Sequence, residues 1–145
     1  MRSLKFRAWD KVTKRYWNVG GLGFEKDRLI EVYLDNYPTT LEGNEDCKKP
    51  DEVILEQYIG LKDKDGNEIY EGDIVQIDSI DELRVGFVDL LYDQYCIVYG
   101  EDDEGRKIVA EFYYYSKPEE NCKVIGNINE NPELLEGENE QKNRG

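Results

Sequence analysis

Apolar and polar residues alternate over short stretches along most of the chain, and turn-forming residues separate these stretches at intervals of about ten positions. This period of two is typical of β-strands, because successive side chains of a strand point to opposite faces of a sheet. We expect strands at residues 4–9, 15–19, 29–34, 53–58, 74–77, 83–88, 94–99, 107–115 and 122–128. The chain is therefore predicted to be mainly β, with the many short strands of a small barrel or a strongly bent sheet.

The N-terminus has the pattern of a β-hairpin. Leu4–Trp9 alternates apolar and basic residues, Asp10–Lys14 is polar, and Arg15–Val19 has the composition of the returning strand. Trp9 and Trp17 are expected to pack, either in the core or as a pair stacked across the hairpin. An aromatic pair that binds a base or a sugar is the alternative.

Two segments without the alternating pattern lie between predicted strands, and a third follows the last predicted strand. Gly20–Gly23 predicts a flexible connection, and it is not a phosphate-binding loop, because it lacks the spacing of one. Asp35–Glu52 contains prolines and many charges and predicts a long loop. Asn131–Leu135 predicts a short helix with Asn131 as its N-cap. The predicted organisation is an N-terminal β lobe at residues 1–56, a second β unit at residues 57–135 and a polar tail at residues 136–145.

The block 57–75 holds the densest turn signals of the chain. Asp65-Gly66 is a tight-turn dipeptide, because glycine adopts a positive φ without strain, and Glu71–Asp73 predicts a second turn. A calcium loop beginning at Asp63 is the alternative, but the glycine falls at its fourth position and not at the sixth that an EF-hand needs. Turn chemistry explains the block better. Architectural roles are predicted for Gly60, Gly66, Gly72, Asp73 and Gly126, and packing roles for Trp9, Trp17, Tyr70 and Tyr113.

The predicted strand 107–115 carries apolar residues at both odd and even positions. Ile108 alternates with Val109, and Phe112 with Tyr113, so both faces of this strand have apolar area. A strand of this kind is covered by another lobe or another subunit more often than by water.

Missing residue types exclude several chemistries. The 145 residues include no histidine, which removes the commonest general base and the commonest metal ligand. Cys47, Cys96 and Cys122 are too far apart in sequence for a C-x-x-C pair, and Cys96 and Cys122 are expected to be small core residues. No apolar run has the length of a membrane span, and no signal peptide is apparent. We expect a soluble protein in a reducing cytosol.

Charge is distributed unevenly along the chain. The formal net charge is −14, yet residues 1–24 carry six basic side chains and a single acidic one. We expect these cations to lean on acidic neighbours; docking on the acidic surface of another copy and contact with phosphates are the alternatives. Nucleic-acid binding by the whole molecule is unfavourable, because the acidic remainder repels phosphates. The basic residues are Arg2, Lys5, Arg7, Lys11, Lys14 and Arg15.

Four blocks, in this order, resemble the YopX-like family of phage and prophage proteins: Lys5–Asp10, Gln57–Asp63, Glu68–Val75 and Val124–Leu135. The resemblance implies a mostly β fold whose C-terminal part is similar to an SH3-type barrel roll. It also implies a gene carried by temperate phages or integrated elements, mostly of Gram-positive bacteria. It assigns no catalytic residues, so none is carried over. The predicted fold is thus an N-terminal β-hairpin lobe, an SH3-like roll and a short C-terminal helix.

These observations favour a non-enzymatic binding or assembly module that works through protein–protein contacts in the bacterial cytoplasm. The expected partners are further copies of the chain and a host or phage protein. An acidic DNA mimic that inhibits a host nucleic-acid-binding protein is the alternative. A hydrolase with Asp73 or Glu71 as its acid or base is a third hypothesis, and a weak one, because in a chain with 33 acidic residues two carboxylates that are close in sequence carry little information. We predict no catalytic residues, no cofactor and no metal ligands.

Overall fold

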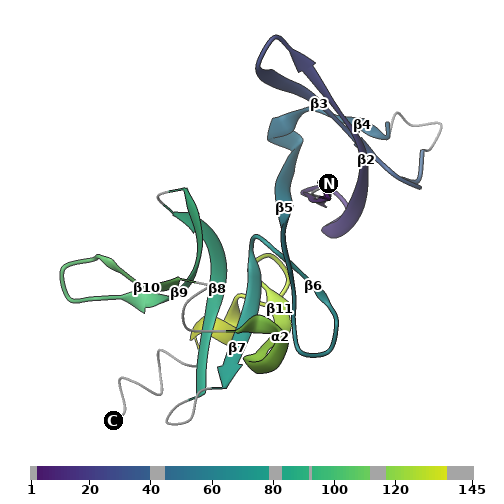
Figure 1. Cartoon of the computed structure of the whole chain (residues 1–145). Helices are drawn as coiled ribbons and strands as arrows, with labels where there is room; N and C mark the ends of the chain where they lie inside the picture. The colour runs from purple at the N-terminus through teal and green to yellow at the C-terminus, as the bar shows by residue number, and fades with distance from the viewer. Residues whose placement is uncertain (1–2, 40–44, 79–82, 92, 112–116, 137–145) are drawn as a thin grey trace. The chain divides into compact units, whose positions relative to one another are not determined.

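The computed structural model describes residues 3–39, 45–78, 83–91, 93–111 and 117–136 (Figure 1). The chain forms two compact units, Met1–Tyr58 and Ile59–Gly145, called here the first and the second unit. Both are built from antiparallel strands with short helical segments, which confirms the mainly β prediction. Among the described residues, no helical segment has the length and hydrophobicity of a membrane span.

The first unit is a twisted sheet in which the predicted N-terminal hairpin is confirmed. Strand β1 pairs with β2 on one side and with β5 on the other, and β3 follows β2 in the sheet. The strand order of this sheet is β4-β3-β2-β1-β5-β6; β5 continues along the chain from the first unit into the second, and the last strand, β6, belongs to the second unit. The elements are β1 (Phe6–Asp10), β2 (Arg15–Glu25), β3 (Arg28–Leu34), β4 (Cys47–Lys48), the 3-10 turn η1 (Pro50–Glu52) and β5 (Val53–Lys62).

The predicted flexible connection at Gly20–Gly23 is wrong, because β2 runs straight through it. In the pairing with β3, Gly20 is an extra residue that bulges out of the ladder. A Cβ atom on Gly20 would lie 2.1 Å from the Oδ1 atom of Asp35. Glycine-rich composition suggested a linker, whereas the structure places these residues in a bulged strand.

The first core lies on one face of this sheet. It contains Ala8, Val32, Leu34, Tyr37 and Val53, each at most 5% exposed. The predicted long loop 35–52 contributes Tyr37 to this core and contains β4 and η1, while its residues 40–44 lie outside the described part. A loop of this length is thus held in place by a buried aromatic residue and a two-residue edge strand.

The second unit is a meander closed by a returning strand. Strands β7, β8, β9 and β10 pair in sequence, and β11 pairs with the free side of β7, giving the order β10-β9-β8-β7-β11. The buried residues of its core include Ile69, Val75, Val88 and Ile97. That the strands of this unit form an SH3-like barrel roll stays a prediction. The elements are β6 (Glu68–Tyr70), β7 (Asp73–Asp78), β8 (Leu83–Leu91), β9 (Gln94–Glu101), β10 (Lys107–Glu111), α2 (Pro118–Asn121) and β11 (Cys122–Asn127).

Two predicted elements of the second unit differ from the structure. The strand expected at 83–88 extends to Leu91, and the polar turn expected before Cys122 contains the single helical turn α2. Of the strand expected at 107–115, residues 107–111 form β10 and residues 112–115, with Tyr113, lie outside the described part. The chain is helical at 133–136, close to the predicted helix. The side-chain oxygen of Asn131, which was expected to cap this helix, instead accepts a hydrogen bond from the preceding Asn127 N–H at 3.3 Å.

Gly86, in the middle of β8, marks a close approach of two strands. A Cβ atom there would lie 2.6 Å from the carbonyl oxygen of Val98 and 2.7 Å from the Cγ2 atom of Ile97. We expect Gly86→Ala to lower the free energy of unfolding by about 2 kcal/mol, because the obstructing oxygen belongs to the backbone. Urea denaturation followed by circular dichroism measures this change.

Gly66→Ala is the matched control for Gly86→Ala. Gly66 has a φ of +84°, but nothing lies within 4 Å of its added Cβ, so only backbone strain of about 1 kcal/mol is expected. Equal stability losses in the two variants would contradict the steric explanation for Gly86.

Candidate functional site

Edge strand β10 exposes two consecutive apolar side chains. Ile108 is 44% exposed and Val109 is 43% exposed, and consecutive residues of a strand point to opposite faces. β10 is the last strand of its sheet, and among the described residues its ladder is with β9. The apolar area predicted on both faces of this strand is confirmed for these two residues.

The irregularity in this ladder lies on β9 and leaves β10 regular. Ile108 stands opposite Gly100 and Val109 stands opposite Val98, so Tyr99 is the extra residue. A bulge on an edge strand discourages pairing with another chain, but here the bulge is on the inner neighbour. The outer edge of β10 therefore keeps the regular geometry that a further strand needs.

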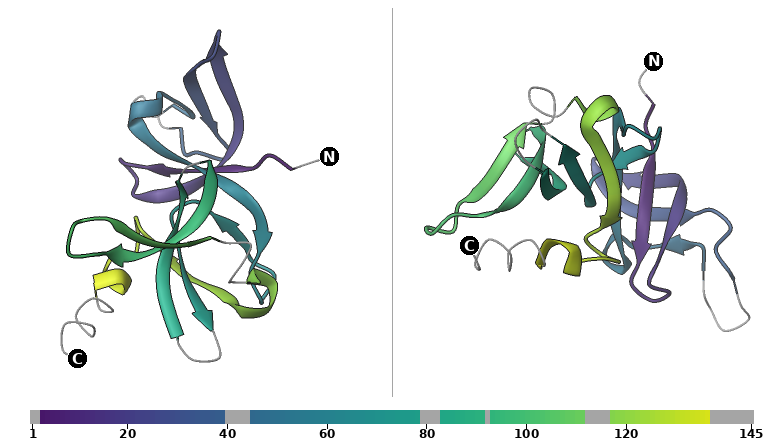
Figure 2. Two further views of the ribbon diagram at one scale, coloured as in Figure 1. Left: turned by 60° about the vertical axis from the view of Figure 1, so that its left-hand side comes forward. Right: turned by 90° about the horizontal axis from the view of Figure 1, so that it is seen from below.

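A rigid acidic turn leads into β10. The carboxylate of Asp102 accepts the N–H groups of Glu104 and Arg106 at 2.9 and 2.8 Å and the Nε–H of Arg106 at 2.8 Å. The hydrogen bond from the Arg106 backbone is the main reason that the pKa of Asp102 lies below its ordinary value. The tip of the β9–β10 hairpin (green) points away from the rest of the second unit in Figures 1 and 2.

Basic side chains stand at the start of β10 within an acidic unit. Residues 59–145 carry nine basic and 22 acidic side chains, whereas residues 1–58 carry ten and 11. Arg106 pairs with Glu104 at 3.0 Å, and the Nζ atom of Lys107 lies 3.5 Å from the Oδ2 atom of Asp89. Both pairs are exposed, so each contributes little to stability.

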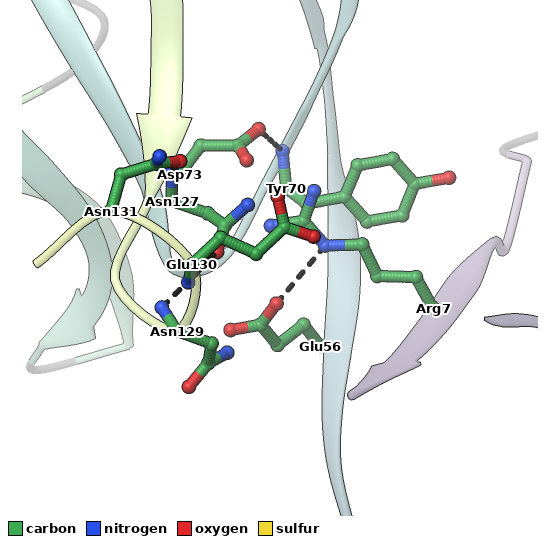
Figure 3. Close-up of polar contacts among 8 residues, drawn as sticks. All are labelled: Arg7, Glu56, Tyr70, Asp73, Asn127, Asn129, Glu130 and Asn131. Atoms are coloured by element: carbon green, nitrogen blue, oxygen red, sulfur yellow. Dashed lines mark hydrogen bonds and ion pairs between the residues drawn. The ribbon is translucent and has the colours of Figure 1, made fainter. Parts of the chain in front are cut away.

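Several basic N-terminal residues contact neighbours within the first unit, and the predicted contact with an acidic side chain is confirmed for Arg7. The Nε–H of Arg7 donates to Glu56 at 3.0 Å (Figure 3), and its guanidinium lies 4.2 Å from the Tyr16 ring centre. The ammonium of Lys5 lies over Tyr58, and that of Lys11 donates to the Asp51 carbonyl at 2.9 Å. Lys14 and Arg15 are exposed, and Arg2 lies outside the described part.

Both tryptophan rings pack, as predicted, but the stack of Trp9 on Trp17 that was one of the two expected arrangements is wrong. The register of the hairpin puts Trp9 opposite Tyr16 and Trp17 opposite Ala8, so the two indoles lie on opposite faces of the sheet. Trp9 makes an edge contact with Tyr16 at 5.1 Å, and Trp17 makes one with Tyr37 at 5.0 Å. A stack of the two indoles would need a different pairing of β1 with β2, and the loop between these strands fixes that pairing.

A buried polar network that the sequence did not reveal surrounds Asp10. Its carboxylate accepts the hydroxyls of Thr13 and Tyr37, each at 2.7 Å, and the Thr13 hydroxyl accepts the indole N–H of Trp17 at 3.0 Å. Burial alone would raise the pKa of Asp10, but these hydrogen bonds outweigh it and the pKa is lowered. Lys48, 6% exposed, places its ammonium 4.5 Å from the Tyr37 ring centre. The available signal was an Asp at the end of a strand with a Thr three residues later, a pattern typical of side-chain-capped turns.

The alternative of a calcium loop at Asp63 is not supported, because the carboxylate of Asp63 accepts hydrogen bonds from backbone N–H groups. Asp63 is 3% exposed and accepts the N–H groups of Asp65 at 3.0 Å, Asn67 at 2.8 Å and Val124 at 3.0 Å. The predicted turn at Gly66 is confirmed by a φ of +84° and by a hydrogen bond from its N–H to the Asp63 carbonyl at 3.0 Å. Asp63 thus joins the turn to strand β11.

Asp73 also has an architectural position, as predicted. It is 2% exposed, and its carboxylate accepts the Tyr70 N–H at 2.8 Å, which closes the turn before β7 (Figure 3). In the same unit, the side-chain oxygen of Asn127 accepts the N–H groups of Asn129 and Glu130 at 3.1 and 2.8 Å. These polar side chains therefore shape turns.

The cysteines differ in accessibility. Cys96 and Cys122 are 5% and 0% exposed, as predicted, and Cys47 is half-buried. Burial, assisted by the charges of Asp63 and Asp73, raises the pKa of Cys122 to about 12. Among the described residues, no group of three or more His, Cys, Asp or Glu side chains has an arrangement that holds a metal ion.

We expect Ellman's reagent to modify Cys47 first in the native protein. Cys96 and Cys122 should react at least about a hundredfold more slowly, because the thiolate is the reactive form and both groups are shielded. Mass spectrometry of tryptic peptides identifies the modified residue, and full reaction in denaturant is the control. Fast native modification of Cys122 would contradict its buried position.

The strand order and the exposed residues of β10 thus describe a mainly β protein of two small units, the second of which has an apolar edge strand. The sequence model of the YopX protein family matches residues 5–136. The chain belongs to the YopX protein family. The crystal structure of protein EF1440 from Enterococcus faecalis is similar, with 26% sequence identity and a TM-score of 0.59 over 93% of this chain and 99% of that chain. No curated protein matches the chain.

Proposed function

We propose that this protein is a non-enzymatic binding or assembly module that acts through protein–protein contacts. It works in the cytoplasm of a bacterium that carries the corresponding phage or prophage, and its partners are further copies of the chain and a host or phage protein. The observation that supports this best is edge strand β10, with Ile108 and Val109 exposed on its two faces.

An edge of this kind favours association. The outward N–H and C=O groups of an edge strand are a template for another strand, and proteins usually protect such edges with proline, bulges or inward-pointing charges. Strand β10 begins with Lys107, but the residues that follow, 108–110, are apolar, and the strand as described has no proline and no bulge of its own. Main-chain pairing then supplies affinity, and the exposed side chains supply selectivity.

Sedimentation velocity over about a hundredfold range of protein concentration tests the proposal, because an assembling chain changes its mean mass with concentration. We expect species heavier than the 17.0 kDa monomer. A constant monomer mass, together with no protein retained by the tagged chain from a lysate of phage-carrying bacteria, would contradict the proposal.

DNA mimicry is the second candidate, because the acidic charge is concentrated in one unit. With nine basic and 22 acidic side chains, residues 59–145 present a compact anionic body that can occupy a site built for DNA. Competition with duplex DNA for bacterial nucleases and polymerases at low salt tests this candidate. Displacement of DNA that weakens steeply with added salt supports mimicry; no displacement at low salt rejects it.

A further inference from the structure

We propose that copies of the chain associate head to tail, with a basic loop of one copy docked on an acidic turn of the next. The basic loop consists of residues 11–15, between β1 and β2, and the acidic turn consists of residues 101–104, between β9 and β10. This inference rests on the proposed function as an assembly module, and it names the partner and the two surfaces that meet.

The basic loop keeps three cations that no carboxylate in the described part of the chain neutralises. Lys14 and Arg15 are exposed and make no ion pair there, and the ammonium of Lys11 donates to a backbone carbonyl at 2.9 Å. Lys5 and Arg7, by contrast, are engaged with neighbours within the first unit. The structure thus narrows the positive N-terminal region to this loop.

Hydrogen bonds fix the shape of the basic loop in the single chain. The buried carboxylate of Asp10 accepts the N–H groups of Val12 at 3.4 Å and of Thr13 at 3.1 Å, and its carbonyl accepts the N–H of Lys14 at 2.9 Å. Val12, which is 68% exposed, stands among the cations. A surface that already has its bound shape loses little conformational entropy on docking, so a few contacts give measurable affinity.

The acidic turn is the longest run of consecutive carboxylates among the described residues of the second unit. The Asp102 carboxylate fixes its shape, and Asp103 is exposed and makes no ion pair with the described part of the chain. The turn is the tip of the β9–β10 hairpin, which points away from the rest of its unit (Figure 2). Ile108, which is 44% exposed, lies a few residues further along the chain. The turn therefore offers carboxylates with apolar area close by.

This combination favours a second copy over a nucleic acid as the partner of the basic loop. Opposite charges on two surfaces speed their encounter and fix their orientation. A phosphate backbone would meet the same cations, but it offers no counterpart to Val12, and the net charge of −14 repels a long polyanion. Repulsion between two copies is screened beyond about 8 Å at physiological salt, whereas the docked groups are in contact.

The contact is heterologous, because the loop and the turn are different surfaces on different units. Each docked pair leaves a free loop at one end and a free turn at the other, so further copies add in the same direction. The mean mass should therefore keep rising with protein concentration.

Charge reversal tests the basic loop. Lys14→Glu should raise the dissociation constant of self-association about tenfold in sedimentation velocity at physiological salt, because a repulsion replaces an attraction. Lys26→Glu is the matched control, since Lys26 is also an exposed turn residue, with a φ of +57° against +55° for Lys14. Both variants carry the same charge change and backbone strain, and the control should stay within about twofold of the natural constant.

Complementation tests the acidic turn. Asp103→Lys should weaken self-association about as much as Lys14→Glu does. An equal mixture of the two variants should associate within about threefold of the natural constant, because the natural loop of Asp103→Lys meets the natural turn of Lys14→Glu. A mixture as weak as its components would contradict the pairing of these two surfaces.

Carbodiimide cross-linking locates the contact, because this reagent joins ammonium and carboxylate groups that touch. An equal mixture of unlabelled and isotope-labelled chains separates links between copies from links within one chain. Mass spectrometry should find mixed-isotope peptides that join Lys11 or Lys14 to residues 101–104. Lys26 should give no such peptides.

The outcomes separate this inference from the proposed function. Self-association that Lys14→Glu leaves unchanged, or loop cross-links confined to single chains, overturns the docking and leaves the assembly module intact. Salt-sensitive binding of a single-stranded oligonucleotide that Lys14→Glu abolishes assigns the loop to nucleic acid and overturns the docking as well. A strict monomer that binds another protein overturns the docking alone, and a strict monomer without any partner overturns both.

Discussion

Replacing Asp63 by alanine is expected to lower the free energy of unfolding by about 4 kcal/mol, because three backbone N–H groups lose a charged acceptor in a buried site. Two of these groups, from Asp65 and Asn67, belong to the local turn. The third, from Val124, lies 61 residues away in β11, at 3.0 Å from the carboxylate. One side chain therefore ties the turn after β5 to the closing strand of the second unit.

Urea denaturation followed by circular dichroism measures the loss, and hydrogen exchange of the Val124 amide locates it. Asp65→Ala is the matched control, since Asp65 lies in the same turn but is exposed, and a change within about 0.5 kcal/mol is expected. If both variants lose the same stability, the carboxylate of Asp63 has no special role.

The pH dependence of stability follows from the same contacts. Burial alone would raise the pKa of Asp63, but the N–H groups of Val124 and Asn67 outweigh it, and the pKa lies below the ordinary 3.8. The ionised carboxylate therefore stabilises the fold above pH 3.8, and this contribution is lost as the pH falls through the lowered value. Asp63→Asn should lose less stability than the natural chain between neutral pH and about pH 3, where an unperturbed carboxyl is protonated. Identical acid destabilisation in both chains would count against this assignment.

Asp10→Ala is expected to lower the free energy of unfolding of the first unit by about 3 kcal/mol. The substitution leaves the hydroxyls of Thr13 and Tyr37 without their 2.7 Å acceptor inside the unit. Both tryptophans of the chain, Trp9 and Trp17, lie in this unit, so intrinsic fluorescence during urea denaturation reports on it selectively.

Two controls accompany Asp10→Ala. Tyr37→Phe removes a single hydrogen bond to the carboxylate and should cost about 1 kcal/mol. Asp27→Ala, at an exposed position in the β2–β3 turn, should change stability by less than about 0.5 kcal/mol. A loss at Asp27 equal to that at Asp10 would contradict the role of the buried network.

The sequence allowed correct prediction of turns and strands that depend on a few neighbouring residues. The dipeptide Asp65-Gly66 gave its turn, since a positive φ depends on the residue itself, and the alternation at Leu29–Leu34 gave β3. Gly20–Gly23 misled, because glycine in a linker and glycine at a close approach have the same composition. Its strand became apparent only through the pairing of β2 with β3, a contact between segments that composition does not reveal.

The candidate site was predictable in part. The two apolar faces of the strand beginning at Lys107 are visible in the sequence, and the structure adds that this strand is the edge of its sheet. The network around Asp10 was not predicted, because Tyr37 and Lys48 reach it from a segment whose composition indicates a loop. Contacts between residues this far apart depend on strand register and not on neighbouring residues.

The sequence by itself determined the class of this protein: mainly β, acidic in its second half, without histidine chemistry and with turns at defined glycines. These properties depend on composition and on the period of two, which each stretch carries locally. Only the tertiary structure decided that Trp9 and Trp17 lie on opposite faces, that Asp63 holds Val124, and that β10 ends a sheet. Each of these depends on which strand stands beside which, and pairing between distant segments is fixed by the packing of the whole unit.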